Sequence, residues 1–211
     1  YFPDSSDIGM NAAVEQTMRT NNISEGLARS ELFYKFLLTV VLSPVSSLGA
    51  AFSQEIAWRG FFLDELSQCI TPSLATWLVG LVWGFSYAPL VSVGAWFGQD
   101  YTGAPFTGVL TFLLFAVAFG NILTFFLLET RSLLPCVLLH SAFIGLTDIW
   151  TFFADPAHPP DVSPLIGPAP PAVLPSFFVL LFGAVTPLYM SFPAPPDEPD
   201  AVLDQHTPTL V

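Results

Sequence analysis

The sequence predicts an all-α fold, a multi-pass transmembrane helical bundle of about five spans with one amphipathic helix, since about 20 mostly apolar residues cross a bilayer. Of its 211 residues, 53% are hydrophobic and 10% are charged, whereas a soluble domain carries about a quarter charged residues. The mean hydropathy is +0.62, and the apolar residues are spread over several long stretches. A single signal peptide does not explain this composition.

The N-terminal segment, Tyr1–Glu31, is mostly polar or small and predicts an interfacial lead-in. An amphipathic helix is expected at Glu25–Lys35. Arg19, Arg29 and Lys35 place this end on the cytoplasmic side by the positive-inside rule. Because the first residue is not methionine, we expect a fragment or a processed chain.

The first apolar stretch, Phe36–Ser53, lacks charged residues and predicts a span, with a kink at Pro44. Residues Gln54–Gln68 alternate apolar and charged side chains, which favours an amphipathic helix lying against the other spans. A second span is expected at Leu74–Leu90. The Gly-rich connection Gly94–Pro105 separates it from the next one.

The third predicted span is Phe106–Leu128, and the charged turn Glu129–Arg131 follows it. The fourth, Leu133–Phe153, carries His140 and Asp148 at positions where polar groups are costly inside a bilayer. Intramembrane ionisable residues therefore mark the place where this chain can do chemistry.

The C-terminal part is expected to hold a Pro-rich loop at Asp155–Pro171, a fifth span at Ala172–Phe192 and an acidic, Pro-rich tail. That tail, at 193–211, predicts disorder. The expected organisation is thus a polar lead-in at 1–31, a membrane domain at 32–192 and the tail.

Composition also limits the partners and cofactors. The net charge is −12 with five Lys and Arg in total, so we expect no nucleic-acid partner, because such surfaces need clustered cations. Cys69 and Cys136 lie far apart without metal-ligand spacing, and no phosphate-cradling glycine loop is found. We expect no metal and no cofactor, and the lipid bilayer as the first partner.

Three polar side chains on predicted helices form the candidate site. Glu55 and Arg59 stand at i and i+4, so they project from one helix face and can pair. His140 lies within an apolar segment and needs a partner, for which Glu55 and Tyr87 are the candidates. A structural role in bridging helices and a functional role both remain open.

Three segments resemble the motifs of one family. Residues Gln54–Gly60 (QEIAWRG) are similar to two glutamates followed by three residues and an arginine. Residues Val82–Leu90 (VWGFSYAPL) resemble an aromatic residue four positions before a histidine, and Thr130–His140 (TRSLLPCVLLH) a charged turn leading to a histidine. From about Phe52 to Ile144, the chain resembles the CAAX-protease and bacteriocin-processing family, which includes the type II CAAX prenyl endopeptidase.

The resemblance implies hydrolysis, within the membrane, of a peptide bond near a prenylated cysteine. In that family, the leading glutamate of the first motif and the histidine of the second activate water. The histidine of the third motif and an asparagine four residues later stabilise the oxyanion. This sequence has Gln54, Tyr87 and Ile144 where the family has the glutamate, the second-motif histidine and the asparagine.

These departures predict impaired catalysis, because the Gln54 amide takes no proton at neutral pH and the Tyr87 phenol is a poor base. A general base contributes about 10²–10⁴ in rate and an oxyanion donor about 10²–10³. Glu55, which remains with Arg59, is one substitute base, although adjacent helix positions point about 100° apart. His140 oriented by Glu55 is the other.

Three hypotheses follow. The first is a membrane protease of impaired activity that keeps the family fold and a polar cavity for a prenylated or apolar peptide. The alternative is a non-catalytic pseudoprotease that binds membrane-protein partners through the same cavity. A transporter fragment would use Glu55, Arg59 and His140 as a relay, but no internal repeat supports it.

Overall fold

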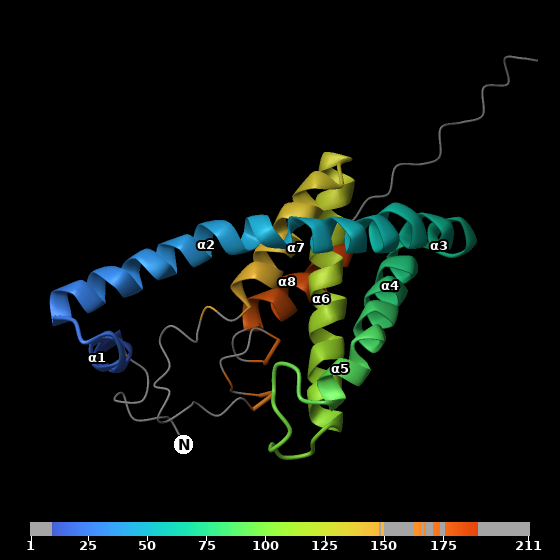
Figure 1. Cartoon of the computed structure of the whole chain (residues 1–211). Coiled ribbons are helices and arrows are strands. Elements are labelled where there is room, and N and C mark those ends of the chain that lie inside the picture. The colour runs from blue at the N-terminus through green and yellow to red at the C-terminus, as the bar shows by residue number, and fades with distance from the viewer. Residues whose placement is uncertain are drawn as a thin grey trace, which may run out of the picture.

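Every regular element that the structure describes is a helix. The computed structural model describes residues 10–147, 149, 163–165, 167, 171–173 and 176–189. These residues form a set of helices and no strand (Figure 1). The all-α prediction is confirmed for this part of the chain.

The N-terminal half is dominated by one long helical segment. Following α1 (Met10–Asn21), α2 (Glu25–Glu55) continues through a π-helix at Ile56–Phe62 into α3 (Leu63–Cys69). Figure 1 shows α2 and α3 as one rod with α1 beside its first turns. The helix, the span and the amphipathic helix that we predicted between residues 25 and 68 are therefore one segment of 45 residues. The polarity changes at Gln54 without a Gly or Pro stop signal, and polarity alone does not end a helix.

The central element is α6 (Phe106–Thr130), which contacts α4 (Pro72–Ser86), α5 (Ala88–Ser92), α7 (Leu134–Leu146) and α8 (Phe177–Tyr189). The second predicted span corresponds to two helices, α4 and α5, which are separated by a single residue. The fourth and fifth predicted spans are represented by shorter helices, of 13 residues each. At its C-terminal end, α6 finishes in the predicted charged turn.

Small residues let these helices approach closely. A Cβ at Gly80 of α4 would lie 2.7 Å from the Cα of Val117 on α6, and a Cβ at Gly145 of α7 would overlap the backbone of Ser43 and Pro44 on α2. Such contacts between backbones are typical of helix packing in membranes. The close crossing of α2 and α7 sets the distance across which their polar residues meet.

Two segments of the described chain are long and apolar enough to cross a membrane, Glu25–Cys69 and Phe106–Thr130. Helices α7 and α8 are apolar but shorter. Most of the predicted Pro-rich loop at 155–171, all of the predicted tail at 193–211 and Asp148 lie outside the described residues.

A buried amide on α6 compensates for a proline in α8. Pro187 lies inside α8 and has no N–H, so the carbonyl of Gly183, four residues earlier, loses its helical donor. The Asn121 side chain is fully buried, and its Nδ2 donates to this carbonyl at 2.9 Å. The Thr186 hydroxyl of α8 donates to the same carbonyl at 3.3 Å, and the shorter bond from Asn121 links α8 to α6.

Replacement of Asn121 by alanine is expected to lower the free energy of unfolding by about 1 kcal/mol, because buried hydrogen bonds in membrane helices average roughly 0.6 and reach about 1.7 kcal/mol. Denaturant unfolding in detergent micelles measures the change. In a Pro187→Ala background the helix regains its own donor, so Asn121→Ala should cost less there. An equal cost in both backgrounds contradicts this role.

Candidate functional site

One buried carboxylate joins two helical segments. Glu55, the last residue of α2, accepts a hydrogen bond through Oε1 from Arg59 Nη1 at 3.1 Å, and the same oxygen lies 2.6 Å from His140 Nδ1 on α7. The side chains of Glu55, Arg59 and His140 are at most 2% exposed. The partner of His140 is thus Glu55, one of the two candidates that the sequence indicated.

The local helix geometry places Glu55 and Arg59 together. The π-helix begins directly after Glu55 and contains Arg59, so the two pair at the i,i+4 spacing within a widened turn. Short π segments inside α-helices are frequently found at functional sites. An ionised carboxylate only accepts hydrogen bonds, so its pairing with Arg59 assigns Glu55 as the acceptor and His140 Nδ1 as the donor. Nε2 is the ring nitrogen that does not face the carboxylate.

Aromatic rings surround this polar cluster. Trp83 lies beneath the Arg59 guanidinium, with 5.3 Å from Cζ to the ring centroid, and meets the His140 ring edge-on at 5.3 Å. Phe119 contacts the same imidazole edge-on at 6.0 Å. The rings exclude water from the Glu55–Arg59 pair, and Coulomb attraction between opposite charges is stronger in such a medium.

Several polar atoms of this cluster have no hydrogen-bond partner among the described residues. They are Glu55 Oε2, Arg59 Nε, Arg59 Nη2 and Trp83 Nε1, all of them buried. The Glu55 carboxylate therefore contacts both the Arg59 guanidinium and the His140 imidazole through a single oxygen. The indole N–H of Trp83 is a buried donor that has no partner among the described residues.

The two remaining candidate residues contact each other. The Tyr87 hydroxyl donates to Gln54 Oε1 at 3.0 Å. Gln54 belongs to α2, and Tyr87 stands between α4 and α5. Both are partly buried. Because this bond uses the amide oxygen of Gln54, its NH₂ group is left as a donor.

A cavity of about 440 Å³ brings the substituted positions together. Its lining includes Gln54, Tyr87, Ile144 and His140, whereas Glu55 and Arg59 are not among the lining residues. This volume lies within the range of small-molecule sites, about 300–1,000 Å³. Every position that departs from the family pattern therefore borders one apolar cavity next to His140.

The aromatic wall of this cavity was not predicted from the sequence. Trp83, Trp96, Phe112 and Phe143 also line it. The sequence carries a signal for Trp83, which stands four positions before Tyr87 and is the aromatic residue of the second motif. Trp96 comes from the Gly-rich connection, where spacing gives no sign of its position in space.

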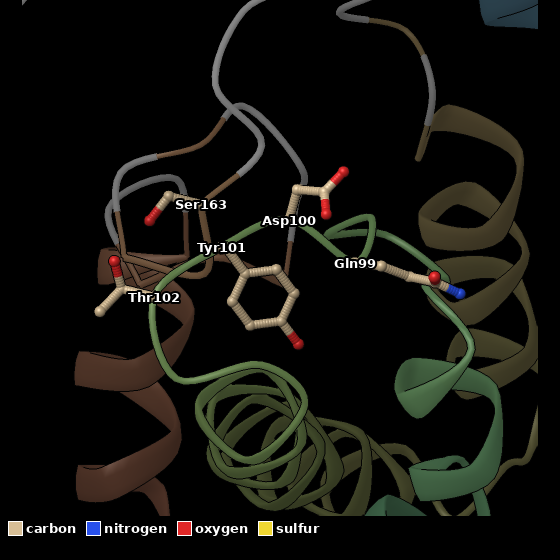
Figure 2. A pocket seen from close by; sticks show the side chains of 5 residues that line it. All are labelled: Gln99, Asp100, Tyr101, Thr102 and Ser163. Carbon is tan, nitrogen blue, oxygen red and sulfur yellow. The ribbon is translucent and has the colours of Figure 1, made fainter.

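A second, more polar pocket of about 570 Å³ lies at the loop between α5 and α6 (Figure 2). Gln99, Asp100, Tyr101, Thr102 and Ser163 line it. Burial raises the pKa of the Tyr101 phenol, and its hydroxyl donates to the Pro105 carbonyl at 3.3 Å. Asp100 is the only carboxylate among the described residues that line this pocket. No group of three His, Cys, Asp or Glu side chains in the described part of the chain could hold a metal ion.

The fold and the cluster define an all-helical protein with a buried Glu–Arg–His site beside an apolar cavity. The sequence profile described as type II CAAX prenyl endopeptidase Rce1-like matches residues 35–145, more than half of the chain. The chain belongs to this family of integral membrane proteins, and the predicted resemblance is confirmed. Searches of curated proteins and of solved structures found no match.

Replacing Glu55 by alanine should destabilise the fold by about 3–5 kcal/mol, because it leaves the buried Arg59 charge unpaired. The double variant Glu55→Ala, Arg59→Met removes both charges and should be more stable than the single variant. Chemical denaturation in detergent measures the free energies of unfolding.

The exposed Glu15–Arg19 pair provides a matched control, because it has the same spacing and its side chains are 68% and 83% exposed. Glu15→Ala should change the free energy of unfolding by less than about 1 kcal/mol. Equal effects of Glu15→Ala and Glu55→Ala would refute a stabilising role for the buried pair.

Proposed function

We propose that this chain is a multi-pass membrane protein that holds an apolar or lipidated peptide in the cavity beside His140, with peptide-bond hydrolysis impaired. The hydrogen bond between Tyr87 and Gln54 on the cavity wall carries this proposal. These residues stand at the positions of the two groups that activate water in the family that the motifs resemble. Here they form a neutral pair instead of a base.

The chemistry of the wall supports binding over hydrolysis. The amide of Gln54 and the phenol of Tyr87 do not take a proton from water at neutral pH. Ile144, at the asparagine position, has no side-chain donor for an oxyanion. Loss of a base costs about 10²–10⁴ in rate and loss of a donor about 10²–10³, although such losses do not simply multiply.

The multi-pass arrangement is supported by the charge-free part of α2. Residues 36–54 carry no charged side chain, and at about 1.5 Å per residue they approach the ~30 Å hydrocarbon core. Val41 and Val45 in this stretch are more than half exposed, which suits contact with lipid. Phe106–Thr130 is a second segment that is long and apolar enough to cross a membrane.

A second candidate function is slow hydrolysis by a rearranged site. His140 lines the cavity, and the Glu55 carboxylate 2.6 Å from Nδ1 would orient the ring so that Nε2 accepts a proton from water. Glu55 itself is less suited as the base, because it is fully buried and is not part of the cavity lining.

Purified protein in liposomes is expected to bind a farnesylated CAAX peptide without cleaving it. Mass spectrometry of the peptide after incubation detects cleavage, and fluorescence anisotropy of a labelled peptide detects binding. Cleavage that disappears in His140→Ala would contradict the binding proposal and establish the second candidate. If the folded protein neither binds nor cleaves apolar peptides, both candidate functions are refuted.

Restoring the family residues tests whether only the chemistry was lost. The triple variant Gln54→Glu, Tyr87→His, Ile144→Asn should gain cleavage that the original chain lacks, by at least about 100-fold above background, the rate that one general base contributes. The same three changes combined with His140→Ala provide the control. A folded triple variant that binds the peptide and stays inactive would show that more than these three groups is missing.

A further inference from the structure

Trp96 closes one side of the cavity. Its indole stacks on Phe112 of α6, with 4.7 Å between the ring centroids and 28° between the planes. The same indole lies 5.8 Å from the ring of Tyr87, and all three residues line the cavity. Trp96 therefore adds a large flat surface to the wall that carries the Gln54–Tyr87 hydrogen bond.

The backbone at Trp96 adopts an unfavourable conformation to place this indole. Its φ is +65°, in the left-handed region, where a residue with a bulky side chain is a rare exception. Strained residues of this kind persist only where the surrounding structure holds them, and they cluster at ligand clamps and active sites. This backbone conformation positions the indole at the cavity wall.

The loop around Trp96 is held in place by its own contacts. The backbone N–H of Ala95 donates to the Leu90 carbonyl at 3.1 Å, and that of Gly98 donates to the Gly94 carbonyl at 3.0 Å. Phe97, the next residue after the tryptophan, is 1% exposed and belongs to the main hydrophobic core. The indole is thus a fixed part of the wall.

We propose that Trp96 determines the length of the apolar chain that the cavity accepts. This inference rests on the proposed binding function. Apart from Ala95, the other lining residues belong to packed helices or border them. Trp96 is on the loop, and shortening its side chain extends the cavity beyond about 440 Å³ while removing only its own ring contacts with Phe112 and Tyr87. The ligand is an apolar, unbranched or isoprenoid chain that ends against the indole.

The test compares peptides that carry C10, C15 or C20 isoprenoid chains, bound to protein in liposomes. Trp96→Ala should raise the affinity for the C20 peptide relative to the C10 peptide by about tenfold or more, because each methylene in an apolar pocket is worth about 10–200-fold. Trp96→Phe should give an intermediate ratio. Trp77, which is 39% exposed on α4 and is not among the lining residues, supplies the control Trp77→Ala, with an unchanged ratio.

The outcomes separate this inference from the function on which it rests. If the original chain binds a probe and the length preference is the same in Trp96→Ala, the role of Trp96 is overturned while the binding function stands. If no probe binds to any folded variant, both are overturned. Should Trp96→Ala fail to fold, the ratio measured with Trp96→Phe decides between the same results.

Discussion

The arrangement of the site depends on one oxygen atom of a buried carboxylate. Glu55 Oε1 holds Arg59 at 3.1 Å and His140 Nδ1 at 2.6 Å, and it joins the long N-terminal helix to α7. A charge in an apolar interior persists only when it is paired, so neither the glutamate nor the arginine can be lost alone without cost. The paired charges orient the imidazole, and the imidazole in turn borders the cavity. The two aromatic rings that contact this imidazole, those of Trp83 and Phe119, keep water away from the Glu55–Arg59 pair.

The residues of the site differ in their position relative to the cavity. Glu55 and Arg59 lie outside the cavity lining, whereas Gln54, Tyr87 and Ile144 form part of it. Glu55 and Arg59 match the family motifs, as do two of the lining residues, Trp83 and His140, whereas the three lining residues Gln54, Tyr87 and Ile144 depart from them. A chain changed in this way keeps a shaped apolar cavity and a single imidazole in its wall. In the function that we propose, the cavity holds the apolar peptide, and efficient hydrolysis needs more proton-transfer groups than the wall supplies.

Local sequence patterns predicted the features that depend on residues close together in the sequence. The i,i+4 spacing predicted the Glu55–Arg59 pair, and the position of His140 in an apolar run predicted that it needs a partner. Apolar runs predicted an all-helical chain, but the ends of helices were less predictable, because a change of polarity at Gln54 does not interrupt the backbone hydrogen bonds. The bond between Gln54 and Tyr87 joins residues far apart in sequence, and Trp96 reaches the cavity through a loop conformation. The first depends on how helices cross and the second on the backbone of a loop, and periodicity determines neither.

The coupling between Glu55 and His140 is the measurement that tests this account most directly. A double-mutant cycle with Glu55→Gln, His140→Phe and the combined variant, unfolded in bilayers, gives the interaction free energy. Because hydrogen bonds to charged groups are worth about 1.5–3 kcal/mol, the account predicts a coupling of at least about 1.5 kcal/mol. Effects that add to within about 0.5 kcal/mol, as expected for independent sites, would show that the shared carboxylate does not hold the site together.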